Sequence, residues 1–316
     1  MPLLEKASRQ REAGEGMPPA PSQGSVTTVP EKSRAERRAS FDVADFPMPT
    51  GREEDWRFTP MDRIGTLLRD TPSGAHLAVD TELPPGVTLT SIPSARARAL
   101  GVPAPQDRAA VLAFAHTDHS GGVMHLQIPA DTVIADPVRI RFVGSHSERV
   151  WGHLVISVGA HSNVTIVVSH EGTARLSEMV STLVGDGAQC TLVSLQEWSS
   201  DTIHAAQHDV VVGRDASVRH VAVTLGGQVV RMSTNITYAG PGGSVEAFGV
   251  YFADAGQHLE HRLFVDHNAP HCQSHVEYKG ALQGDSAHTV WVGDVLIRAS
   301  AEGTQTYELN RNLLLT

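Results

Sequence analysis

One five-residue pattern recurs five times along the chain, as VGAHS (158–162), VGDGA (184–188), VGRDA (212–216), AGPGG (239–243) and VDHNA (265–269). The second residues of these segments lie at 159, 185, 213, 240 and 266, so the pattern returns every 26 to 28 residues. A steady period of this length is typical of stacked structural units. Each unit has room for two strands and two turns, which is one coil of a parallel β-helix.

Runs rich in Val, Ile and Thr accompany these turns. They predict strands at Val123–Ile128, Val138–Val143, Leu154–Val158, Val164–Ser169, Cys190–Leu195, Val218–Leu225, Ser244–Phe252 and Val290–Arg298. An antiparallel meander could have strands of the same length, but the constant repeat favours a solenoid over a Greek-key sandwich. Because glycine tolerates positive φ, we expect equivalent corners at Gly159, Gly185, Gly213 and Gly240.

Three regions are expected along the chain. Residues 1–30 are rich in Pro, Gly, Ser and charge, and they predict a disordered tail. Residues 31–115 predict a helical and irregular amino-terminal region, with helices over Glu31–Phe46 and Pro60–Leu68. The first of these helices begins near a capping-box pattern, Ser33 to Glu36. Residues 116–316 predict the all-β, β-helical core.

Composition excludes several classes of function. The 25 basic and 35 acidic residues give a formal charge of −10, which argues against a general nucleic-acid partner. No run of 18 apolar residues is present, so no membrane association is expected, and the amino terminus lacks an apolar signal sequence, which predicts a cytoplasmic protein. The one lysine followed by Ser or Thr is Lys32, and it is preceded by Glu31 instead of the glycine that a P-loop needs, so the chain has no P-loop and is not itself expected to be an ATPase.

The two cysteines, Cys190 and Cys272, exclude a disulfide framework and an all-cysteine four-ligand metal site. Each follows a predicted corner, so the two should lie three coils apart in nearly the same column. Three strand spacings are on the order of 14 Å, too far for a disulfide. Cys190 is interpreted as a small buried hydrophobe, whereas Cys272, among histidines and near Lys279, is the better candidate for a functional thiol.

Two other functions remain open from the residues alone. Sixteen of the 17 histidines lie at or after His116, and the densest group runs from His258 to His275, which raises a His-rich metal-binding protein as one alternative. The spacings in that group match no standard metal motif. A β-helix polysaccharide lyase or hydrolase is the other alternative, with Asp186, Asp215 and Asp254 as its carboxylates.

Two parts of the chain resemble the SufB/SufD family of iron–sulfur cluster assembly scaffolds, and SufD most. GREEDWRFTP (51–60) is similar to the family's K-x-E-D-W-R-Y-T signature. The second segment begins with GQHLEHR (256–262). It then resembles D-H-x-x-P-x-C-x-S … Y-K-G-x-L … A-x-x-V-x-x-G … N-x-N-L-L-L-S through VDHNAPHCQS (265–274), YKGAL (278–282), residues 287–295 and NRNLLLT (310–316). The resemblance covers about residues 35–316.

The resemblance implies a right-handed parallel β-helix and a non-catalytic scaffold subunit of the SUF iron–sulfur cluster assembly complex. Its implied partners are SufB and the separate ATPase SufC. An iron–sulfur cluster would be held transiently in the complex, and no cofactor would be bound stably by the isolated chain. The candidate residues for contact with a cluster or iron are Cys272, His267 and His271. The residues that match the family motifs are Trp56, Asp266, Tyr278, Lys279, Gly280, Asn310 and Asn312.

The end of the chain departs from the family pattern. Members of the family continue after N-x-N-L-L-L into a final β segment with a functional histidine and then into a helical region that docks SufC. This chain ends at Thr316. We therefore expect a β-helix truncated at its carboxyl-terminal end, with Leu313, Leu314 and Leu315 near an open end through which the chain self-associates.

Overall fold

The structure is a computed structural model, and it describes residues 37–315. These residues belong to one compact unit that begins at Arg37. The predicted disordered tail and the Ser33–Glu36 capping box lie outside the described residues.

The amino-terminal region consists of short elements. They are a 3-10 helix (Val43–Asp45), α1 (Met61–Ile64), β1 (Ala78–Glu82), β2 (Thr88–Ile92), α2 (Ser94–Ala99), α3 (Arg108–His116) and a second 3-10 helix (Thr117–Ser120). The predicted helix at Pro60–Leu68 is present as α1 and the turns that follow it. The prediction of a helix up to Phe46 is wrong in the described part, where only one 3-10 turn forms behind the Asp42 cap.

Strands dominate the rest of the chain. They are β3 (Val123–Ile128), β4 (Val138–Val158), β5 (Asn163–Val184), β6 (Gln189–Trp198), β7 (Ile203–Val212), β8 (Ser217–Thr224), β9 (Val229–Tyr238), β10 (Ser244–Ala253), β11 (His258–His267), β12 (Gln273–Leu282), β13 (His288–Ile297) and β14 (Gln305–Leu314). Each of the eight predicted strands lies within one of these, to within one residue. No strand was predicted from the sequence at β7, β9, β11, β12 or β14.

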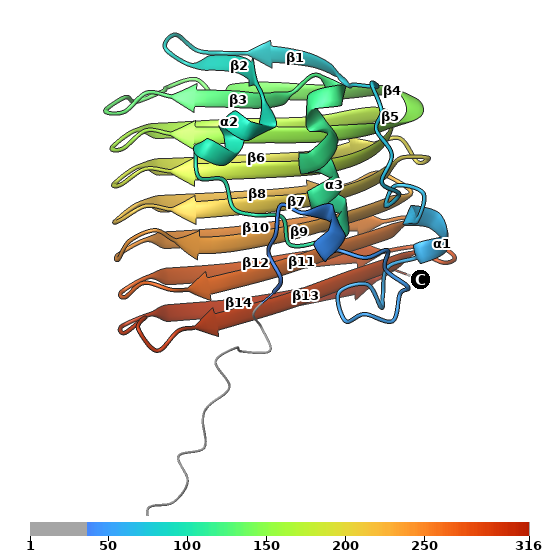
Figure 1. Cartoon of the computed structure of the whole chain (residues 1–316). Coiled ribbons are helices and arrows are strands. Elements are labelled where there is room, and N and C mark those ends of the chain that lie inside the picture. Colours follow the sequence, from blue (N-terminus) through green and yellow to red (C-terminus); the bar gives the residue numbers. More distant parts are fainter. Residues whose placement is uncertain (1–36, 316) are drawn as a thin grey trace, which may run out of the picture. The chain divides into compact units, whose positions relative to one another are not determined.

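The strands form a right-handed parallel β-helix, which confirms the predicted fold class (Figure 1). Neighbours follow the order β13-β11-β9-β7-β5-β6-β8-β10-β12-β14, and every pair along this path is parallel. β4 and β5 are long enough to pass through a corner and contribute to both faces. We call the face of β7, β9, β11 and β13 the first face, and the face of β6, β8, β10, β12 and β14 the second face. β1 and β2 pair antiparallel with β4 and β3 at the first coil.

The predicted corner glycines lie at corners, but for a different reason from the one expected. None of the four has positive φ. An added Cβ on Gly185 would lie 2.7 Å from the Ala160 nitrogen, and one on Gly213 would lie 2.7 Å from the Gly185 carbonyl carbon. Close approach of the neighbouring coil therefore requires glycine there. Positive φ occurs two residues later in each corner, at His161, Gly187, Asp215 and Gly242.

The coils lengthen toward the carboxyl terminus. The register runs from Asn163 to Gln189, Ser217, Ser244, Gln273 and Gln305, so the last two steps are 29 and 32 residues. The fifth turn assigned from the sequence is therefore displaced. Asp266 lies inside β11, and the positive-φ position of that corner is His271.

This lengthening also shifts the cysteines relative to the prediction. Cys190 aligns with Val218, Val245 and then Ser274, so Cys272 lies two positions before the predicted column. Both thiols are free and buried, and three coils separate them, as predicted.

The two faces differ in what covers them. On the second face, buried and more exposed residues alternate along β6 and β8, because only the inner side is packed. On the first face, β7, β9 and β11 are buried almost throughout, because the amino-terminal region packs on their outer side (Figure 1). No helix within residues 37–315 is long and apolar enough to cross a membrane.

Candidate functional site

The three residues expected to contact a cluster lie near one corner but differ in orientation. The His267 ring is buried, stacks on Tyr238 with 5.0 Å between centroids, and places Nε2 2.9 Å from the Ser274 hydroxyl. Cys272 is fully buried, and its thiol lies 3.5 Å from the Pro270 carbonyl oxygen. His271 is exposed. Within residues 37–315, these three side chains do not form a group with metal-ligand spacing.

Two of the family-motif residues form ion pairs. Asp266 accepts hydrogen bonds from the Arg298 guanidinium at 2.8 Å and 2.7 Å, a two-point contact that joins the end of β11 to the start of the next corner. Lys279 is exposed, and its Nζ lies 2.5 Å from Glu277 Oε1 on the same strand. Arg298 holds Asp266 in place at the edge of the first face, whereas the Lys279 pair faces solvent.

Four other motif residues gather around the buried Tyr251 in the last coils. The Tyr251 hydroxyl donates to Asn312 Oδ1 at 2.7 Å and accepts from Asn310 Nδ2 at 2.9 Å. Tyr278 is buried beside them, and Gly280 leaves room for the Tyr251 ring. Burial raises the pKa of the Tyr251 hydroxyl, so it stays protonated and keeps donating. These contacts indicate a structural role for this part of the motif.

Trp56 packs on a buried cation of the first face. Its ring covers the Arg231 guanidinium at 4.1 Å, and Arg231 also lies 2.5 Å from Asp107 and 3.5 Å from Glu260. Arg231 and Glu260 are fully buried, although both point outward from the β-helix, because the amino-terminal region covers them.

The two segments that resemble the family contact each other at this point. Glu260 accepts from the Thr59 hydroxyl at 2.7 Å, and Arg262 lies 3.2 Å from Asp55. Burial by itself raises the pKa of Glu260, but hydrogen bonds from His258 and Thr59 and the charges of Arg231 and Arg262 lower it to about 2. We call this set of charges the ionic clamp: Asp55, which is partly exposed, and the buried Asp107, Arg231, Glu260 and Arg262.

Asp209 is a second buried carboxyl on the outer side of the first face. It accepts hydrogen bonds from Gln207 at 2.9 Å and from Asn235 at 3.0 Å, and no cation contacts it in the described residues. Burial raises the pKa of Asp209 from an ordinary value near 3.8 to about 7, although these hydrogen bonds lower it in part. The carboxyl is therefore protonated in the folded chain at pH values where it is ionised in the unfolded chain.

This pKa predicts a pH-dependent effect of Asp209→Asn. Between pH 3.8 and about 7, the unfolded chain loses the proton while the folded chain keeps it, so Asp209 destabilises the fold increasingly as pH rises. The amide carries no such charge. We expect the melting temperature of the variant, relative to the natural chain, to be higher at pH 8 than at pH 5. Thermal unfolding at both pH values measures this, and a difference that is constant or falls with pH would contradict it.

The interior of the second and third coils holds a buried His–Glu–His group. His170 and Glu178 lie on β5 at either side of a corner, and His204 lies at the start of β7. All three are at most 2 % exposed. Glu178 Oε2 lies 3.2 Å from His170 Nε2 and 3.3 Å from His204 Nε2. Within residues 37–315, this is the only group of His, Cys, Asp and Glu side chains with metal-ligand spacing.

Polar neighbours hold the outer nitrogens of these rings. Gln196 Nε2 lies 3.2 Å from His170 Nδ1, and Trp198 Nε1 donates to Gln196 Oε1 at 2.9 Å and lies 3.2 Å from His204 Nδ1. Burial by itself raises the pKa of Glu178, but the charges and hydrogen bonds of His170 and His204 hold it well below its usual range. Sequence reasoning missed this group, because its members are on different strands and meet only across a corner.

The three aspartates of the lyase alternative do not share a site. Asp186 and Asp215 lie at one line of corners, where Asp186 Oδ1 accepts from the Arg214 amide at 2.9 Å. Asp254 follows β10 at the opposite end of that strand, and its carboxylate accepts from the Ala255 amide at 2.8 Å. A ten-residue strand separates these ends by about 30 Å. All three lie in or beside turns, and they form no carboxylate set.

Comparison with known proteins agrees with the fold. A family model described as "SUF system FeS cluster assembly, SufBD core domain" matches residues 141–316. An iron-sulfur cluster assembly SufBD family protein of Mycobacterium bovis is 43% identical over 292 residues, which cover 90% of this chain and 73% of that protein. One of Mycobacterium leprae is 42% identical over 304 residues, 93% of this chain and 76% of that protein. A more distant one of Synechocystis is 25% identical over 204 residues, 60% and 45% of the two chains.

The β-helix with its clamped amino-terminal region therefore defines a SUF-type assembly protein. The chain belongs to the SufBD family. Membership supports a role in iron–sulfur cluster assembly within a multi-subunit system, and it confirms the resemblance to the SufB/SufD family as a whole.

Proposed function

We propose that this chain is a SufD-like scaffold subunit that pairs with a SufB-type subunit and works with a SufC-type ATPase in the cytoplasm. The observation that carries the proposal is family membership together with a β-helix that has no phosphate-binding loop. Such a chain supplies a surface on which an iron–sulfur cluster is assembled, without catalysing a reaction itself. The cluster is transient cargo of the complex, and Cys272, His267 and His271 are the residues proposed to contact it.

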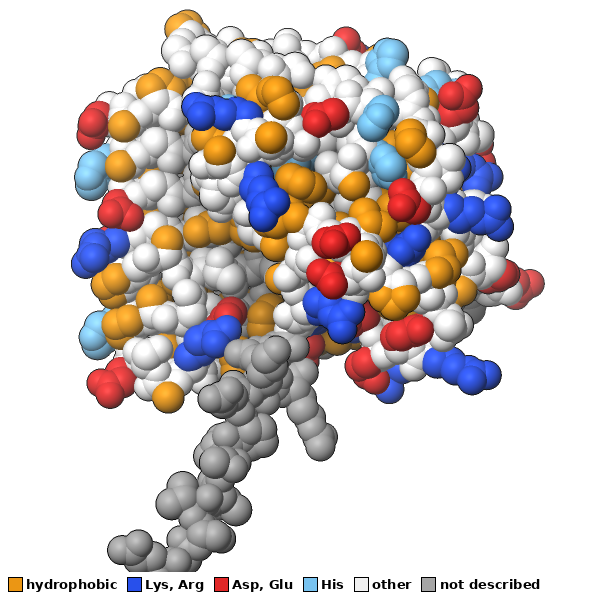
Figure 2. Space-filling model, viewed as in Figure 1, with side chains coloured by type: hydrophobic (Ala, Val, Ile, Leu, Met, Phe, Trp, Pro, Cys, Tyr) orange, Lys and Arg blue, Asp and Glu red, His pale blue; other side chains and the backbone are white. Residues whose placement is uncertain are grey.

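The distribution of charged side chains on the surface bears on the kind of partner that the chain would bind. On the face viewed in Figure 2, basic and acidic side chains are interspersed, which does not favour a nucleic-acid partner.

Co-expression tests the proposed pairing. The tagged chain is expressed with a SufB-type and a SufC-type subunit from the same organism, isolated anaerobically, and assayed for partners, ATP hydrolysis and cluster absorption. We expect the SufB-type subunit to co-purify, and ATP hydrolysis to occur only in samples that contain the SufC-type subunit. Absence of any complex with either partner would overturn the proposal.

A further inference from the structure

A buried carboxylate needs a nearby positive charge, because an isolated charge in the interior is strongly unfavourable. The groups within ion-pair distance of Glu178 in the described residues are His170 and His204. Glu178 Oε2 and His204 Nε2 are both buried and face each other at 3.3 Å, and in the described residues neither atom has a hydrogen-bond partner outside this group. The charge of Glu178 is thus matched only by a proton on an imidazole, or by a cation between the three groups.

The spacing of these atoms fits a metal ion. With metal–nitrogen and metal–oxygen distances of about 2.1 Å, neighbouring ligand atoms lie about 3.0 to 3.4 Å apart in octahedral or tetrahedral sites. The two distances from Glu178 Oε2 to the imidazole nitrogens are 3.2 Å and 3.3 Å. Two imidazoles and one carboxylate suit Fe²⁺ and its first-row neighbours, and they do not suit Ca²⁺ or Mg²⁺, which prefer oxygen.

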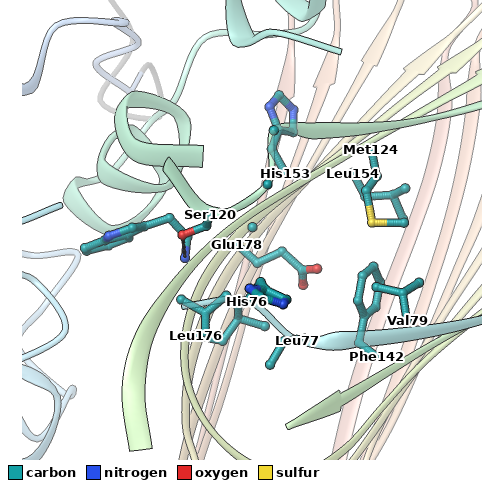
Figure 3. Close-up of a pocket in the computed structure, with 15 residues that line it drawn as sticks. His76, Leu77, Val79, Ser120, Met124, Phe142, His153, Leu154, Leu176 and Glu178 are labelled. Carbon is teal, nitrogen blue, oxygen red and sulfur yellow. Dashed lines mark hydrogen bonds between the residues drawn. The ribbon is translucent and has the colours of Figure 1, made fainter. Parts of the chain in front are cut away.

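A pocket connects this group with the surface. It has a volume of about 210 Å³, and its lining runs from the exposed His76 and Val79 to the buried Glu178. Figure 3 shows the Glu178 carboxylate projecting into the pocket near His76 and Phe142. Gly152 pairs with Glu178 in the neighbouring coil and also lines the pocket. Because glycine has no side chain, the space next to the Glu178 carboxylate stays open.

We propose that His170, Glu178 and His204 bind one divalent first-row transition-metal ion, which enters through this pocket. The site goes beyond the proposed scaffold function, because it is complete within the isolated chain and needs no partner. It also departs from the expectation that the isolated chain holds no cofactor stably. Glu178 is the member of the group that lines the pocket, so water or another small ligand from the pocket would complete the coordination.

The hydrogen bonds around the rings set a condition for binding. Trp198 Nε1 carries one proton, which it shares between Gln196 Oε1 and His204 Nδ1. Because the indole nitrogen can only donate, its contact with His204 favours the ring form that carries its proton on Nε2, where the metal would bind. Metal binding moves that proton to Nδ1, which then conflicts with the indole N–H. Trp198→Phe removes this donor and keeps an aromatic ring. We therefore expect Trp198→Phe to bind the metal at least as tightly as the natural chain.

Metal titration of the isolated chain tests the site. The full chain is purified anaerobically, stripped with a chelator, and titrated with Fe²⁺, and bound metal is measured after desalting. Co²⁺ is titrated in parallel, because its visible absorption reports imidazole and carboxylate ligands. We expect one ion per chain and an affinity reduced at least tenfold in Glu178→Gln. His220→Gln is the matched control, since His220 is equally buried but lies outside the group, and we expect it to bind as the natural chain does.

A second variant keeps the test valid if Glu178→Gln unfolds. In Gly152→Val, the first added carbon would lie 3.4 Å from Leu176 and 3.5 Å from Glu178, which are ordinary contacts, and the rest of the side chain narrows the pocket. We expect slower loading with the same final stoichiometry. Equal uptake at equal affinity by the natural chain and a folded Glu178→Gln variant would overturn the site and assign the metal to exposed histidines. No saturable uptake by the natural chain would also overturn it. Neither result bears on co-purification with a SufB-type subunit, which is measured separately.

Discussion

Glu260→Gln is expected to lower the free energy of unfolding by about 3–5 kcal/mol, the usual effect of breaking a buried ion pair. Glu260 lies 3.5 Å from Arg231 and 3.3 Å from Arg262, and both guanidinium groups are buried. The amide is nearly the same size, so packing is kept while the two cations lose a charge that balances them. Urea unfolding followed by circular dichroism and tryptophan fluorescence measures the loss. Trp56 reports on the clamp directly, because it stacks on Arg231.

An exposed pair provides the matched control. Glu246 lies 2.5 Å from Arg219 on the outer side of the second face, with side chains 43% and 52% exposed. Exposed ion pairs contribute about 0–1 kcal/mol, because water and salt screen them, so Glu246→Gln should have little effect. If both glutamine variants had the same small effect, the clamp would not be what holds the amino-terminal region on the β-helix.

Gly280→Ala is expected to destabilise the chain by about 1–3 kcal/mol or more, because it overfills a packed interior. An added Cβ would overlap the Tyr251 ring and the Asn312 side chain, and it would lie 2.7 Å from Tyr251 Cζ. The ring cannot move away freely, because its hydroxyl is bonded to Asn310 and Asn312. Thermal unfolding measures the effect, with Gly152→Ala as the glycine control, since its Cβ makes no contact shorter than 3.4 Å.

A double variant separates this packing from a role in binding. Tyr251→Leu removes the hydroxyl and the far edge of the ring, so Gly280→Ala should cost less stability in that background than in the natural chain. Equal losses in both backgrounds would mean that Tyr251 is not the obstacle. A natural-like melting temperature for Gly280→Ala alone would show that the glycine of the Y-K-G motif serves something other than interior packing.

The repeat in the sequence predicted the coil but not its internal register. Similar residues recur at the corners, such as Gly185 and Gly213, because the corners of successive coils stack directly on one another. The coils lengthen after Ser244, and the prediction placed the fifth turn three residues too early. The pattern of Val-rich strands does not show how long the loop between two strands is. On the first face, β7, β9 and β11 were not predicted, for a related reason. β7 and β11 carry His, Asp, Glu and Arg on the side that the amino-terminal region buries, so they lack the alternation of a half-exposed strand.

The candidate metal site could not be predicted from the sequence, because the fold alone brings its residues together. His170 and Glu178 are eight residues apart on one strand, and only the bend of β5 turns their side chains toward each other. The family motif drew attention to His267, His271 and Cys272, which are close in sequence but differ in burial. The family motif did include residues of the ionic clamp, because its amino-terminal and carboxyl-terminal segments contact each other there.

The ionic clamp also orders events during synthesis. Thr59 and its partner Glu260 are 201 residues apart, so the ribosome delivers one side of the contact long before the other. At about 5–20 residues per second, the delay is about 10–40 s. Throughout that interval Trp56, Ile64 and Leu67 have no complete first face to cover, and the nascent chain presents them to the cell. The apolar side of the amino-terminal region therefore stays uncovered until the coils on which it packs have been synthesised.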